Sequence, residues 1–167
     1  MSGVEMHTSE ETMILDSVDR FLERDVRPVA RELEASDTYP QSIVDRMIEL
    51  GLFGATISTE YGGLGLSATT YASIIERISA VWMSVSGIVN SHLIMAAAVQ
   101  RFGTARQKTH YLPRFASGEL RGGIGLTEPD CGTDLQGIRT QAVGEDDHYV
   151  VNGAKTWITN SAEGGIL

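Results

Sequence analysis

The sequence contains a single cysteine, Cys131, and few cationic side chains. One cysteine excludes an internal disulfide and any cysteine-rich zinc site. Lysine and arginine number 13 against 22 acidic residues, which gives a net charge of −9. Because nucleic-acid binding usually requires a clustered cationic face, we expect no nucleic-acid partner. His7, His110 and His148 are too scattered along the chain to predict a metal site.

Long apolar runs and targeting signals are also missing. No stretch approaches ~18 uninterrupted apolar residues, so we expect no membrane span. The most apolar helical candidate, residues 88–99, is interrupted by Asn90, Ser91 and His92. The first seven residues have neither a charged segment followed by an apolar core nor an arginine-rich amphipathic presequence. A cytoplasmic location is therefore the expectation.

The composition that remains is that of an ordered globular protein, with 42% apolar and 21% charged residues. A length of 167 residues suffices for one domain, or one domain and part of another. Up to about residue 120 the apolar residues recur at helical spacing. The first predicted helix starts at a Thr8–Glu11 capping box, and Pro28 should kink or divide it. The second runs from Pro40 to Gly51, and the third starts at Ser67. The fourth spans 85–102, and the fifth runs from Thr104 to before Pro113.

From Arg121 onward the pattern becomes that of short strands. We predict strands over 140–143 and 148–151, a two-residue hairpin turn at Asn152-Gly153, and a returning strand over 155–159. The fold class is therefore α+β. An all-α helical domain, residues 1–120, precedes an incomplete antiparallel β domain, residues 121–167, whose three or four strands leave an open sheet edge.

Two runs in the β portion have the residue types that a flat, polar-edged ligand requires. In Thr127-Glu128-Pro129-Asp130-Cys131-Gly132-Thr133-Asp134, proline restrains the backbone, glycine permits close approach, and threonine hydroxyls stand on either side. On a strand, Trp157 and Thr159 would project from one face and offer a stacking surface and a hydroxyl. An ordinary Pro/Gly turn, and a packed tryptophan beside a solvent-facing threonine, are the alternatives.

Both runs resemble the flavin-binding segments of the acyl-CoA dehydrogenase family, and nearly the whole chain from about Glu10 matches that family in order. The supporting segments are Gly51-Leu52-Phe53-Gly54, Tyr61-Gly62-Gly63-Leu64-Gly65, Phe102-Gly103-Thr104 with Gln107, Tyr111-Leu112-Pro113 and Ser117-Gly118-Glu119. One departure is Cys131-Gly132-Thr133, where family members commonly have Ala-Gly-Ser. Threonine keeps the hydroxyl of serine and adds a methyl group.

The resemblance implies an FAD-dependent oxidoreductase of acyl-CoA metabolism that forms a double bond between the α and β carbons of an acyl-CoA thioester. It implies flavin contacts from Ile124, Leu126, Thr127, Thr133, Trp157, Ile158 and Thr159. Thr133 would also lie where flavin and acyl-CoA meet, and the Thr159 hydroxyl would point toward the reactive flavin nitrogen. Implied partners are an acyl-CoA substrate, an electron acceptor such as an electron-transfer flavoprotein, and further copies of the full-length chain.

The family's catalytic base, a glutamate, would lie beyond Leu167. Because Glu76, Glu119 and Glu128 do not match its position, we assign no catalytic residue and predict that residues 1–167 alone are inactive. The acyl chain length is not specified by these residues. Two alternatives remain open: a related flavin oxidase or monooxygenase of the same fold, and a non-catalytic remnant that binds a partner.

Overall fold

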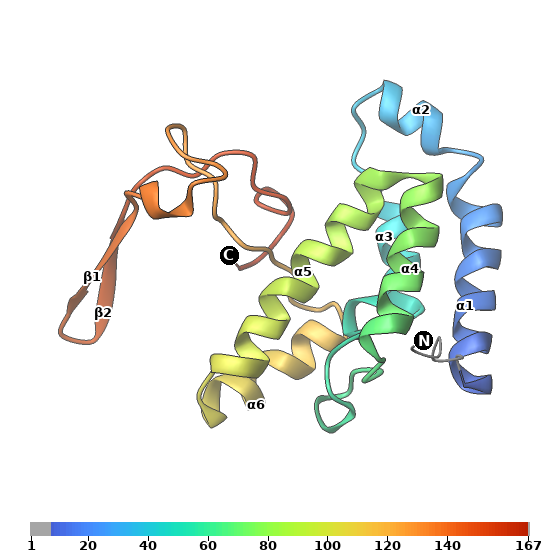
Figure 1. Cartoon of the computed structure of the whole chain (residues 1–167), viewed down its shortest axis with the longest axis horizontal. Coiled ribbons are helices and arrows are strands. Elements are labelled where there is room, and N and C mark those ends of the chain that lie inside the picture. The colour runs from blue at the N-terminus through green and yellow to red at the C-terminus, as the bar shows by residue number, and fades with distance from the viewer. Residues whose placement is uncertain (1–7, 167) are drawn as a thin grey trace, which may run out of the picture.

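The computed structural model describes residues 8–166, a helical region followed by a small β region (Figure 1). His7 and the rest of the N-terminal segment examined for targeting signals lie outside the described residues. The helical region comprises α1 (Ser9–Phe21), η1 (Leu22–Val26), α2 (Ala30–Ala35), α3 (Gln41–Glu49), η2 (Leu52–Gly54), η3 (Thr59–Tyr61), α4 (Ala68–Val81), α5 (Met83–Phe102) and α6 (Ala105–Ala116). The β region contains η4 (Leu135–Gly137), β1 (Gln141–Glu145) and β2 (His148–Asn152).

Side-chain caps fix the starts of three helices. Thr8 and Glu11 form the capping box of α1, in which each side chain accepts a hydrogen bond from the other residue's backbone N–H. Thr104 and Gln107 form a second capping box at α6, and Ser67 caps α4. These bonds satisfy N–H groups that have no partner within the helix, so the predicted starts are confirmed.

The two prolines of the predicted helix boundaries behave differently. Near Pro28 the first helix is divided as predicted, by the π-helical turn η1 and a short turn before α2. Pro113 lies inside α6, which continues to Ala116, so the prediction that this helix ends before Pro113 is wrong. Leu112 and Phe115 are fully buried on either side of it, and their packing carries the helix past the missing N–H.

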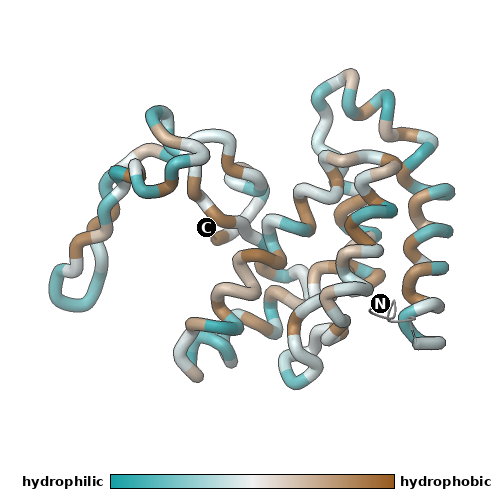
Figure 2. The backbone as a smooth tube through the Cα atoms, viewed as in Figure 1, coloured by the Kyte–Doolittle hydropathy of each residue, from teal (hydrophilic) through white to brown (hydrophobic). Residues whose placement is uncertain are grey.

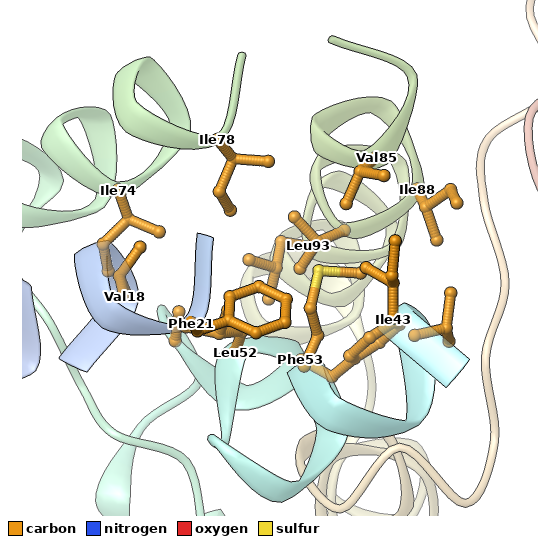
Figure 3. Close-up of a cluster of buried hydrophobic side chains, with 14 of the residues drawn as sticks. Val18, Phe21, Ile43, Leu52, Phe53, Ile74, Ile78, Val85, Ile88 and Leu93 are labelled. Atoms are coloured by element: carbon orange, nitrogen blue, oxygen red, sulfur yellow. The ribbon is translucent and has the colours of Figure 1, made fainter. Parts of the chain in front are cut away.

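The helical region closes around one hydrophobic core, to which α1, α3, α4, α5 and η2 contribute apolar side chains (Figure 3). Val18 of α1 lies beside Ile74 of α4. Phe53 of η2 packs edge-on against His92 of α5, with ring centroids 5.0 Å apart. Among residues 8–166, only α5 is long and apolar enough to cross a membrane. Eight of its residues are buried, six of them in this core, which accounts for its composition.

In the β region, β1 and β2 form an antiparallel hairpin that projects away from the helices (Figure 1). Glu145 pairs with His148, so Asp146 and Asp147 form the turn, and Asp146 has a φ of 43°. The predicted turn at Asn152-Gly153 is wrong, because residues 155–159, the strand that it would join to β2, do not form a strand. Within residues 121–166 the sheet has two strands rather than three or four, and the fold class α+β is confirmed.

The predicted strand over 155–159 does not form. Trp157 and Asn160 have φ angles of 58° and 66°, in the left-handed region that no strand residue adopts. The chain instead returns toward α5, where Gly122 and Ile166 form an isolated parallel bridge. The predicted division at residue 120 falls between α6 and β1 and stays a prediction. Coloured by hydropathy, the helices carry apolar stripes, whereas the hairpin tip is hydrophilic (Figure 2).

Candidate functional site

The Thr127–Asp134 run folds into a compact turn. Glu128 N–H donates to the Cys131 carbonyl at 2.9 Å, and Cys131 N–H donates back to the Glu128 carbonyl at 3.2 Å. Asp134 then accepts from Gln136 N–H at 3.1 Å and caps η4. The single cysteine is half-buried in this turn. The turn thus has its own hydrogen bonds, and Gly132 stands open, with no atom close to where a side chain would begin.

The segment after the hairpin lies alongside this turn. Thr156 N–H donates to the Thr127 carbonyl at 2.9 Å, and Lys155 Nζ donates to the Leu126 carbonyl at 3.0 Å. A methyl group at Gly125 would lie 3.6 Å from Lys155 Cγ, an ordinary van der Waals contact, so the two segments pack side by side at normal spacing. The two runs singled out in the sequence are therefore brought together, although by backbone and lysine contacts rather than by a strand pair.

Glu128, to which the sequence alone assigns no role, is buried in the hydrogen-bonded Thr127–Asp134 turn. Its carboxylate accepts from Arg139 N–H at 2.8 Å, Thr140 N–H at 2.9 Å and Lys155 Nζ at 2.9 Å. Hydrogen bonds from Thr140, Arg139 and Lys155 lower the pKa of Glu128 from its ordinary value of 4.5 to about 2. The carboxylate is thus ionised and fully engaged at neutral pH. No local pattern indicates this, since its donors lie 11 to 27 residues away along the chain.

An open hollow of about 510 Å³ lies between the turn and the segment after the hairpin. Its lining residues are Thr127, Glu128, Pro129, Asp130, Cys131, Gly132, Thr156 and Trp157. Thr127 is half-buried, and Asp130 pairs with Arg139 at 3.1 Å. Of the predicted flavin contacts, Thr127 and Trp157 line this hollow, whereas Ile124, Leu126, Thr133, Ile158 and Thr159 are not among its lining residues.

Trp157 has two features that packing among residues 8–166 does not explain. Its side chain is 90% exposed, and its backbone is in the left-handed region with a φ of 58°. That conformation is unfavourable for a bulky residue, and exposing an indole forgoes its burial. Strain of this kind is concentrated at binding and catalytic sites. We interpret the bare indole as a stacking surface for a ligand.

Thr159 faces a different hollow from Trp157, so the prediction that both project from one face is wrong. The second hollow, of about 320 Å³, lies against the helices. Its lining includes Leu33, Tyr39, Trp82, Ile88, Thr159 and Asn160. The separation follows from the absent strand, because side chains at i and i+2 share a face only in extended backbone.

Asn160 connects the site to the helical core. Its side-chain Nδ2 donates to the Ile88 carbonyl of α5 at 3.0 Å and to the Gly122 carbonyl at 2.9 Å. Its left-handed backbone is one that asparagine tolerates better than most residues. The sequence pattern alone indicates no role for Asn160. The structure shows that it holds the chain reversal after Trp157.

The donor set around the first hollow suits a flat ring with a polar edge. The indole of Trp157 offers an apolar face, while hydroxyls of Thr127 and Thr156 stand at the same opening. The nearby carboxylates of Glu128 and Asp130 are each paired with a cation, which reduces their repulsion of an anionic ligand. Within residues 8–166 no group of three or more histidine, cysteine, aspartate or glutamate side chains gathers to hold a metal ion.

Family models match both regions of the chain. Residues 8–119 match the model "Acyl-CoA dehydrogenase, N-terminal domain", and residues 123–167 match "Acyl-CoA dehydrogenase, middle domain". A short-chain-specific acyl-CoA dehydrogenase of Clostridium acetobutylicum is 38% identical over 154 residues, which are 92% of this chain and 41% of that protein. The chain therefore spans about two fifths of that relative's length.

Solved structures agree with these matches. An acyl-CoA dehydrogenase from Bacillus anthracis complexed with FAD has a TM-score of 0.83 and 35% identity, covering 96% of this chain and 29% of its own. A chain of the structure described as the electron transferring flavoprotein of Acidaminococcus fermentans has a TM-score of 0.90 and 33% identity, covering 97% and 43%.

Proposed function

The chain belongs to the acyl-CoA dehydrogenase family, and on that premise we propose that residues 124–133 and 156–159 form one wall of an FAD site in an acyl-CoA dehydrogenase. One observation carries this proposal. The bare, strained Trp157 lies at the same hollow as the Thr127 turn, which is the pairing that the resemblance implies. The FAD complex of the Bacillus anthracis relative supports the choice of ligand.

The residues of this chain would bind and orient the flavin rather than perform the proton transfer. Trp157 would stack on the ring, and the Thr127 hydroxyl would donate to its edge. Thr133, exposed in this structure, would lie where flavin and acyl-CoA meet, and Thr159 would approach from the second hollow. A bound FAD would accept the hydride that leaves the β carbon of the acyl-CoA thioester when the α carbon loses its proton.

None of the three acids considered for the proton transfer is suited to it. Glu128 has a pKa of about 2 and three hydrogen-bond donors, so it is a poor base at neutral pH. Glu76 is exposed on α4, and Glu119 pairs with Arg114 at 2.8 Å on the helical surface. We therefore propose that the base of the complete site is supplied by residues other than 8–166.

The same proposal extends to the protein's partners. An acyl-CoA thioester is the substrate, and an electron-transfer flavoprotein is the electron acceptor, in keeping with the flavoprotein structure that this chain resembles. We also propose that the full-length chain assembles with further copies of itself and that it is located in the cytoplasm. The net charge of −9 means that the phosphates of FAD and coenzyme A require local donors rather than a general attractive field.

A flavin titration tests the proposal. We expect added FAD to bind residues 1–167 weakly, with a change in its visible absorbance and quenching of its fluorescence. Trp157→Ala and Thr159→Ala should each weaken binding by about tenfold or alter the bound spectrum, because each removes a stacking face or a hydroxyl donor. Val143→Ala on the exposed hairpin is the matched control. Unchanged affinity and spectrum in both site variants would overturn the assignment.

A further inference from the structure

Glu128 is the only residue other than glycine that is buried among residues 121–166. A region of this size normally buries apolar side chains, and a buried carboxylate normally destabilises the fold unless it is paired. Its residue is 6% exposed, whereas Val143, Tyr149, Val151 and Trp157 stand in solvent. The β region is therefore organised around an ionised group rather than around an apolar core.

The groups that surround this carboxylate come from three separate parts of the chain. Glu128 itself belongs to the turn, Arg139 and Thr140 precede β1, and Lys155 follows β2. Two backbone N–H groups and one ammonium converge on it at 2.8–2.9 Å. The carboxylate thus joins the turn, the entry to the hairpin and the exit from it at one point.

Lys155 extends the connection toward the hollow. Its Nζ contacts both Glu128 and the Leu126 carbonyl, and the next residue, Thr156, bonds the Thr127 carbonyl. Trp157 follows directly. The position of the indole relative to the Thr127 turn is therefore set by these contacts, because residues 153–159 form neither helix nor strand.

We propose that Glu128 and Lys155 form an ionic clamp that sets the spacing between the Thr127 turn and Trp157, and so determines the affinity and orientation of the flavin. Both are positioning residues. The inference rests on the proposed function, since it concerns the same hollow. A buried ion pair is a weak source of net stability, but losing one partner leaves the other charge uncompensated and frees the geometry that the pair imposed.

The clamp predicts a specific pattern among four variants of residues 1–167. Glu128→Gln and Lys155→Met should each weaken FAD binding about tenfold and change the circular dichroism of the bound flavin. The double variant should be little worse than either single one, because both act through one contact. Lys155→Arg keeps the charge and should restore most of the affinity. The control Glu145→Gln, an exposed carboxylate of β1, should bind FAD like the parent.

A second readout needs no flavin. The indole N–H resonance of Trp157 should shift in Glu128→Gln and in Lys155→Met, while that of Trp82, which bonds Glu34 in the helical region, stays in place and reports an intact core. An unshifted Trp157 resonance in both variants would overturn the clamp.

The two readouts separate the two proposals. If the parent binds FAD and both clamp variants bind it equally well, the clamp is wrong and the flavin site stands. If the Trp157 resonance shifts as expected but the parent binds no FAD, the clamp stands as a structural device and the flavin site is wrong. Equal losses in Lys155→Arg and Lys155→Met would also contradict the clamp, because the charge would then not matter.

Discussion

The helical and β regions of this chain are stabilised in different ways. Residues 8–116 enclose an apolar core in which Phe53, Phe115 and Met47 are fully buried. Residues 121–166 bury one carboxylate and leave Trp157, Tyr149 and Val151 largely exposed. The helical region buries most of its apolar side chains within itself. The β region leaves its apolar side chains exposed to solvent and is held together by polar contacts. A region of the second kind is built to be covered by something else, which we propose is in part a flavin.

The largest expected effect concerns catalysis. If the two regions together still lack a base, residues 1–167 with added FAD should not turn over any acyl-CoA thioester with an artificial electron acceptor. The assay is a steady-state reduction of that acceptor across thioesters of several chain lengths. Turnover at ~1 s⁻¹ or above, a typical enzyme rate, would show that a base within the chain has been missed.

Truncation of one buried and one exposed apolar side chain tests the comparison in energetic terms. Phe53→Ala should lower the free energy of unfolding by about 3–5 kcal/mol, because it opens a cavity in a closed core. Val143→Ala, at a side chain that is 53% exposed in β1, should change it by less than about 0.5 kcal/mol. Urea denaturation followed by helical circular dichroism measures both. Similar losses in the two variants would mean that the regions are not built differently.

The helical core should also be sensitive to pH through His92. Burial between Phe53 and Phe115 lowers the pKa of its ring to about 4, although a ring nitrogen lies 3.2 Å from the Phe115 carbonyl. The unfolded chain takes up a proton near pH 6.5 and the folded chain only near pH 4, so stability falls as pH decreases through this window. The loss should reach about 3 kcal/mol.

Unfolding free energies from pH 7.5 to 4, measured for the parent and for His92→Gln, isolate this contribution. The neutral variant should lose less stability over the window. The lowered pKa values of Glu11 and Glu128, both about 2, contribute mainly below pH 4.5 and equally in both proteins, so the difference between the two curves reports His92. Parallel curves for the two proteins would contradict the assignment to His92.

A smaller, local effect is expected at the junction between the regions. Asn160→Ala removes two hydrogen bonds and places alanine at a φ of 66°, so it should destabilise the chain reversal by about 1–3 kcal/mol. Asn160→Gly loses the same bonds without backbone strain and should have a smaller effect. Hydrogen exchange of the Gly164 and Gly165 amides, which bond Asn160 and Arg121 carbonyls, reports the opening. Unchanged exchange in Asn160→Ala would exclude the role given to this residue.

The same contrast explains which features could be predicted from the sequence. The starts of α1, α4 and α6 are fixed by capping contacts between residues three positions apart, and the core residues recur at helical spacing. Both features are local in the sequence and can therefore be predicted from it. Asn152-Gly153 is a strong local signal for a hairpin turn, but residues 155–159, which would return as its second strand, form no strand. Pairing between strands decided the turn, and the sequence pattern does not specify that pairing.

The site was predicted in part for the same reason. The Thr127 turn and Trp157 were identified from residue types, and the structure brings them to one hollow. Their connection through Glu128 depends on donors up to 27 residues away, and the left-handed backbone of Trp157 has no signature in its neighbours. Features fixed by distant contacts were therefore the ones missed.

The central claim is that the uncovered surface of the β region is a flavin surface, and mapping FAD onto the chain by ¹H–¹⁵N NMR tests it most directly. We expect FAD to shift the amide resonances of residues 124–133 and 156–159 and the indole N–H of Trp157, and to leave those of α1, α3 and α6 unchanged. Absence of any shift at high FAD concentration, or shifts confined to the helical region, would contradict it.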